Sequence, residues 1–297
     1  MIPDDITPII REIDDELKAA GVHPVGRPLQ AIMRFGTRFG VSMPLGSPKL
    51  SLPGMLEENR PYTDMIYAWY ETVYGDQVKM DPSASARVVV RADSDLWELR
   101  LPIIFGSAAI YLSRTLDEER EREGLRPSAY NPCNSLSKIT QARLNQFNDD
   151  DLREVFDQFI AGMAVRQAFS RFSATNHFFT EAQADWMTAV MHMTSQRPSY
   201  GQSRWASLQL AEKFMKGLLT VIGDVNPVPH THRLEVLHKA LEQSIMGLDT
   251  KSLLLDIQCT AAVRYGEEPS TQAQAYSAHR NSLLLIKALG SVKNASA

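Results

Sequence analysis

The chain has 297 residues, and 44% of them are apolar. Because a single hydrophobic core rarely grows beyond about 250 residues, this length predicts two domains. The 31 basic and 35 acidic residues give a formal net charge of −4, which excludes a chain that binds nucleic acid or anionic membranes by bulk positive charge. Any anion site must therefore be local.

Cysteine usage and the opening residues indicate a cytoplasmic protein. The only cysteines, Cys133 and Cys259, lie far apart and form no CxxC motif, which is typical of a reducing compartment. The opening MIPDDITPII carries acids where a secretory signal carries basic residues. The longest nearly apolar run, at 101–112, has 12 residues, whereas a membrane span needs about 20. We therefore expect no membrane association.

Residues 1–178 are predicted to form an α+β region that resembles no family. A first helix is expected from about Asp5 to Ala20, because apolar residues recur at helical spacing and Gly21 can end it. Repeated Pro and Gly at 44–61 predict an irregular connection. A second helix is expected over 60–74. Its apolar stripe, which we interpret as core, consists of Ile66, Trp69, Tyr70 and Val73.

The segment ARVVVRADSDLWELRLPIIF predicts the only sheet of the chain. Two β-rich runs, around 86–92 and 96–104, flank Ala-Asp-Ser-Asp, a composition typical of a turn. The chain should therefore reverse near Asp93 to Asp95 and form a small antiparallel hairpin. We expect the long helix after Asp149 to cover one of its faces.

That long helix begins with NDDDL and then repeats apolar residues at helical spacing. Its clustered aspartates, Asp149, Asp150 and Asp151, could bind a divalent metal. However, Asn148 and acidic side chains at a helix start also cap free amides and complement the helix dipole without a ligand. We favour the capping role and predict no metal site.

Residues 179–297 are predicted to form a helical bundle, which makes the fold mainly α. No strand pattern follows residue 178, and helices separated by Pro- and Gly-rich breaks are expected at 180–194, 203–222, 232–246, 251–264 and 271–289. Short connections imply antiparallel neighbours in an up-and-down bundle. The residues expected to be buried in it are Trp205, Leu208, Phe214, Leu218, Leu237 and Leu241.

Four sequence elements occur in order within 179–290: EAQADWMTAVMHM, RWASLQLAEKFMKGLLTVIG, PHTHRLEVL and AVRYGEEPSTQAQAYSAHRNSLLLIKAL. In this order they resemble the helices of the HEPN family (higher eukaryotes and prokaryotes nucleotide-binding). The family pattern has Ala-Glu-Lys on one helix, here ending at Lys213. It continues with His-x-Leu, here His232 to Leu234, and with Arg-Tyr, here Arg264 and Tyr265, before an Ala-rich final helix.

The resemblance implies two classes of function. Members that carry Arg-x(4–6)-His are metal-independent endoribonucleases, among them toxins and defence effectors, in which the arginine steadies the scissile phosphate and the histidine handles the 2′-hydroxyl proton. Members without that pair are nucleotide- or RNA-binding and dimerising modules, some of which work beside a nucleotidyltransferase.

Arg233 and His238 have the spacing of the catalytic pair, in RLEVLH. The pair lies at the His-x-Leu helix start, however, whereas ribonuclease members carry it on a later helix. Five residues at about 100° each also place the two side chains about 140° apart around a helix. His238 further falls near an apolar stripe, so the alternative is a partly buried, hydrogen-bonded histidine.

A phosphate site is the other candidate. Thr231 is a plausible N-cap, and a helix start directs free amides and partial positive charge outward. The residues that would bind the phosphate there are His230, His232 and Arg233, with Lys213 and Lys216 from the preceding helix and Arg264 from the Arg-Tyr element. The alternative is that His232 only caps or packs. Zinc bound by the histidines is disfavoured, because no fourth ligand follows at a suitable spacing.

We therefore expect a HEPN-like module that binds nucleotide or RNA and forms a homodimer, with a nucleotidyltransferase-type protein as a further candidate partner and no cofactor. One alternative is a metal-independent endoribonuclease of the toxin–antitoxin or defence type that uses Arg233 and His238. Another is a purely structural dimerisation module.

Overall fold

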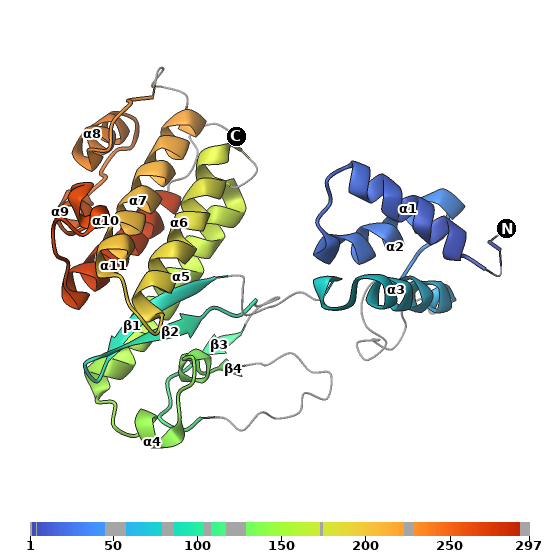
Figure 1. Ribbon diagram of the computed structural model, residues 1–297, viewed down its shortest axis with the longest axis horizontal. Coiled ribbons are helices and arrows are strands. Elements are labelled where there is room, and N and C mark those ends of the chain that lie inside the picture. Colours follow the sequence, from blue (N-terminus) through green and yellow to red (C-terminus); the bar gives the residue numbers. More distant parts are fainter. Residues whose placement is uncertain are drawn as a thin grey trace. The chain divides into compact units, whose positions relative to one another are not determined.

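The computed structural model describes residues 2–3, 5–44, 58–78, 86–103, 108–116, 129–172, 175–222 and 228–291. The chain divides into two compact units (Figure 1). Unit 1 comprises Met1–Asp81 with Glu121–Arg126, and unit 2 comprises Pro82–Arg120 with Pro127–Ala297. The division therefore lies near residue 81 and not at 178, because the hairpin and the helix after it share one hydrophobic core with the C-terminal helices.

The described part of unit 1 contains the helices α1 (Thr7–Ala19), α2 (Arg27–Phe39) and α3 (Arg60–Tyr74), with 3₁₀ turns η1 (Pro24–Gly26) and η3 (Gly75–Val78). The helix expected at 5–20 is confirmed as α1, and the one at 60–74 as α3, whereas α2 was not predicted. Ile66 and Tyr70 are buried as expected, but Val73 is 53% exposed. Most of the irregular connection predicted at 44–61 lies outside the described residues.

Unit 1 also buries an acidic side chain. Asp14 is 1% exposed, and its carboxylate accepts a hydrogen bond from the Tyr74 hydroxyl at 2.6 Å and pairs with Lys18 at 2.8 Å. Burial acts to raise the pKa of Asp14, but the hydrogen bonds from Lys18 and Tyr74 outweigh it and leave that pKa below its ordinary value. Asp14 thus joins α1 to α3 as an ionised group.

Unit 2 begins with the predicted hairpin, β1 (Arg87–Ala92) and β2 (Asp95–Arg100), which pair antiparallel. Asp93 and Ser94 form a two-residue turn with φ of 47° and 65°, and two positive φ values suit the right-handed twist of a hairpin. A second, parallel pair is formed by β3 (Ala109–Ile110) and β4 (Ala129–Tyr130). The expectation that the hairpin is the only sheet was therefore wrong.

Helix α5 (Asp149–Phe172) packs against β1, as expected. Its start is capped by a side chain: the Asn148 side-chain oxygen accepts from the amides of Asp150 and Asp151 at 2.8 and 2.9 Å. Asp151 in turn accepts from the amides of Asn148 and Asp93, both at 2.9 Å, and so ties the hairpin tip to the helix. Among the described residues, no cluster of acidic, His or Cys side chains could hold a metal ion. The short elements η4 (Pro132–Ser135) and α4 (Gln141–Leu144) connect β4 to α5.

The remaining long helices, α6 (His177–Thr194), α7 (Tyr200–Ile222) and α11 (Gln272–Gly290), lie side by side with α5 in a bundle (Figure 1). No strand occurs in the described part of 179–291. The predicted core residues are buried, except that Trp205 is only partly covered. No described helix, in this bundle or elsewhere, is long and apolar enough to cross a membrane.

Shorter elements follow α7: α8 (Leu234–Ser244), η5 (Lys251–Leu253), α9 (Leu254–Ile257) and α10 (Ala262–Tyr265). The single helix predicted at 251–264 was therefore wrong. The chain becomes extended at Gln258, with ψ of 127°, and this break separates α9 from α10. The side chain of Gln258 bonds to the backbone at the start of α8, a long-range interaction that helical periodicity does not reveal.

Candidate functional site

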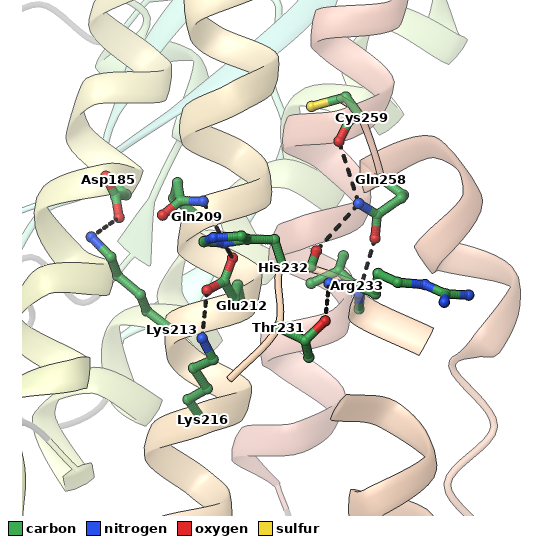
Figure 2. Close-up of polar contacts among 11 residues, drawn as sticks. Asp185, Gln209, Glu212, Lys213, Lys216, Thr231, His232, Arg233, Gln258 and Cys259 are labelled. Atoms are coloured by element: carbon green, nitrogen blue, oxygen red, sulfur yellow. Dashed lines mark hydrogen bonds and ion pairs between the residues drawn. The ribbon is translucent and has the colours of Figure 1, made fainter. Parts of the chain in front are cut away.

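The candidate site is centred on Glu212, a carboxylate on the most buried face of α7. Its side chain is 4% exposed and accepts three polar contacts. Lys216 lies 2.7 Å from Oε1, whereas Gln209 Nε2 and His232 Nδ1 lie 3.2 and 2.8 Å from Oε2 (Figure 2). A charged group that is nearly fully buried is stable only with such partners. Lys216 supplies the opposite charge.

His232 reaches this carboxylate from the segment before α8, while its side chain stays 70% exposed. The Glu212 carboxylate accepts a hydrogen bond from Nδ1 of His232. This contact orients the imidazole so that Nε2 points away from the carboxylate. Nε2 makes no hydrogen bond to any residue that the structure describes. The Trp205 ring lies 6.3 Å away, centroid to centroid. A buried acid that orients an exposed imidazole can support proton transfer, nucleophilic attack or anion binding.

The backbone around His232 is held on both sides. Gln258 donates from Nε2 to the His232 carbonyl at 3.3 Å and accepts from the Leu234 amide at 2.9 Å. The Thr231 hydroxyl accepts from the Arg233 amide at 3.1 Å. The N-cap of α8 is thus Arg233 rather than Thr231, and two amides expected to face a phosphate already have partners within the chain. The helix start is a weaker anion site than the sequence predicted.

Of the predicted lysine and arginine partners, Lys216 is brought to His232 through Glu212, whereas Lys213 and Arg264 have other surroundings. Lys216 pairs with Glu212, and Lys213 pairs with Asp185 of α6 at 2.6 Å. Arg264 lies at the other end of α7, where its carbonyl accepts from Gln202. Ten helical residues separate Gln202 from Glu212, a rise of about 15 Å, so Arg264 is remote from His232.

Arg233 and His230 remain available. Both side chains are exposed and have no ion pair among the described residues. Figure 2 shows the His232 ring directed toward α7 and the Arg233 side chain extending to the opposite side of the segment. The side chains of His232 and Arg233 therefore face different surfaces.

His238 is a core histidine. It is 1% exposed, with Nε2 2.9 Å from the Thr250 hydroxyl and Nδ1 3.3 Å from Glu242. Burial lowers the pKa of His238, although Glu242 acts in the opposite direction. Arg233 is exposed and His238 is enclosed, so the structure does not place the two in one open site.

Comparison with known proteins adds no assignment: no family model, no curated protein and no solved structure matches this chain.

Sequence reasoning named His232 as a site residue but assigned no role to Glu212 or Gln258. A signal for Glu212 was present, since it occupies a buried position of the strongly apolar helix α7, between Leu208 and Met215. A charged residue within an apolar stripe usually has a buried partner. No comparable signal marked Gln258, whose contacts depend on tertiary packing.

Proposed function

We propose that residues 179–297, within unit 2, are a HEPN-like module that binds a nucleotide or an RNA strand and forms a homodimer. One observation carries the proposal: Glu212 of the Ala-Glu-Lys element and His232 of the next element are hydrogen-bonded at 2.8 Å. Two sequence elements that carry the resemblance therefore build one polar cluster, at a buried position of α7. A nucleotidyltransferase-type protein is the partner that the resemblance suggests.

Binding is expected at the surface around the start of α8. Arg233 and His230 supply exposed side chains that have no ion pair among the described residues. From residue 179 onward the sequence has nearly equal numbers of basic and acidic residues. The ligand should therefore be held by a few specific contacts rather than by bulk charge.

The experiment is a titration of fluorescently labelled ATP, and separately of a labelled single-stranded RNA, against the full chain. Arg233→Ala should weaken binding by about tenfold, because one charge-assisted contact is removed. Arg264→Ala is the matched control and should leave affinity unchanged, since Arg264 lies at the far end of α7. Equal affinities for wild type and Arg233→Ala would place the site elsewhere. If neither probe binds, the result would favour the alternative of a purely structural dimerisation module.

The alternative of a ribonuclease that uses Arg233 and His238 receives less support. Both ring nitrogens of His238 already contact other side chains, and the ring is almost completely buried. A general base must reach the proton that it abstracts. These contacts support a structural role for His238.

A further inference from the structure

We propose that Nε2 of His232 is a phosphoryl acceptor, a site of reversible histidine phosphorylation in which Glu212 is the positioning residue. This inference does not depend on nucleotide or RNA binding. It rests on the combination of an exposed imidazole, a buried carboxylate at Nδ1 and a backbone that is held in place.

The proton on the His232 ring determines which ring nitrogen can act as the nucleophile. The Glu212 carboxylate lies 2.7 Å from Lys216 Nζ and 2.8 Å from His232 Nδ1. A carboxylate oxygen can only accept, so Nδ1 is the donor, and a neutral His232 then carries its lone pair on Nε2. Fixing the tautomer in this way makes one nitrogen the nucleophile, which is the role of an orienting carboxylate beside a catalytic histidine.

The imidazole of His232 is accessible to a donor. The side chain of His232 is 70% exposed, so Nε2 can meet either a small donor or a residue on another protein. Gln258 and Thr231 hold the flanking backbone, so less conformational entropy is lost when the donor binds. A histidine that served only to satisfy Glu212 would have no need of this exposure.

The reaction balances without a redox partner. The Nε2 lone pair forms a bond to phosphorus of an acyl phosphate or phosphoramidate donor, while the bond from phosphorus to the donor's oxygen or nitrogen breaks. The leaving group departs as a carboxylate or as ammonia. The Nδ1 proton stays on the ring and remains hydrogen-bonded to Glu212, which stabilises the positive charge that develops on the imidazole.

The test uses the full chain and potassium phosphoramidate near neutral pH, with phosphohistidine located by mass spectrometry under non-acidic conditions and its isomer identified by NMR. His230 is an internal reference, since it is also exposed but has no carboxylate partner among the described residues. His232 should be phosphorylated on Nε2 about tenfold or more faster than His230. Measurements on the wild-type protein are sufficient for this arm: equal rates at the two histidines, or phosphorylation of His232 on Nδ1, would overturn the proposal.

Glu212→Gln supplies the second arm. The variant should lower the rate at His232 to about that of His230, with the rate at His230 unchanged. Thermal unfolding confirms that the variant is folded. If a folded Glu212→Gln protein phosphorylates His232 as fast as wild type, Glu212 has no positioning role and the proposal fails.

Discussion

The Tyr276 hydroxyl on α11 donates a hydrogen bond to the Glu154 carboxylate on α5. Glu154 also accepts from Gln158 at 2.9 Å and lies 3.5 Å from Arg280, so one acidic side chain holds together two helices of the bundle that are far apart in sequence. Tyr276 is 7% exposed, and burial raises the pKa of its hydroxyl, which keeps it protonated as the donor.

Removing this hydroxyl should destabilise unit 2. Tyr276→Phe deletes a hydrogen bond to a charged acceptor, which typically contributes about 1.5–3 kcal/mol. The free energy of unfolding from urea titration is the measurement. Tyr265→Phe is the control, because Tyr265 is 70% exposed and its hydroxyl makes no hydrogen bond among the described residues. Equal stabilities of the two variants would show that the Glu154 contact contributes nothing.

His238→Ala should lower stability without affecting any RNA cleavage. The substitution leaves a cavity and removes the hydrogen-bond partner of Thr250. Together these changes should lower the free energy of unfolding by roughly 2 kcal/mol or more. His230→Ala, at an exposed position, should stay within about 0.5 kcal/mol of wild type. Both proteins are then incubated with RNA in EDTA. Cleavage by wild type that is lost specifically in a folded His238→Ala protein would restore the ribonuclease alternative.

His279 should make unit 2 sensitive to mild acid. It is fully buried on α11, neither ring nitrogen has a hydrogen-bond partner among the described residues, and burial lowers its pKa to about 3 from 6.5. The unfolded chain then binds a proton below pH 6.5 that the folded protein does not. Stability contributed by the neutral ring is complete above pH 6.5 and falls progressively as the pH drops below it.

The measurement is urea unfolding between about pH 7.5 and pH 5, above the range where most carboxylates titrate. His279→Leu should be at least as stable as wild type at the upper end, because it replaces two unsatisfied polar atoms by apolar ones. The free energy of unfolding of His279→Leu should also fall less steeply than that of wild type as the pH is lowered. A residual slope is expected from His238, whose pKa burial also lowers. Parallel pH profiles for wild type and His279→Leu would contradict the assignment.

Gly201→Ala should strongly destabilise the junction of α7 with α10. A Cβ atom there would lie 2.2 Å from the carbonyl oxygen of Val263, and a backbone atom cannot move aside as a side chain can. We expect the free energy of unfolding to fall by about 3 kcal/mol, the upper end of the range for overpacked cores. Thr220→Ala, at an exposed position near the other end of α7, is the control for substitution on the same helix. A Gly201→Ala protein as stable as this control would mean that α10 does not approach α7 so closely.

Elements set by local periodicity were predictable from the sequence. The apolar stripes of α1, α5, α7 and α11 and the Asp-Ser turn of the hairpin are properties of neighbouring residues, and the structure has them near the expected positions. The division of the chain was not predictable in this way. It depends on β1 packing against α5, a contact between segments about 60 residues apart.

The candidate site was located only in part. His232 was named as a site residue, and the apolar stripe near His238 favoured a partly buried role for that histidine. The structure agrees on exposure: His232 is 70% exposed and His238 is enclosed. Lys213 and Lys216 looked like free cations because their partners, Asp185 and Glu212, are identified by helix packing rather than by spacing.

The two hydrogen bonds of Gln258 have a consequence for how the protein opens. Since one amide side chain binds both the His232 carbonyl and the Leu234 amide, the first turn of α8 cannot separate from the segment after α9 without breaking both bonds at once. These two short elements should therefore unfold and refold as one cooperative unit, of lower stability than the long helices. In hydrogen exchange, the Leu234 amide should be protected to the same free energy as the backbone of α9, and Gln258→Ala should release both together.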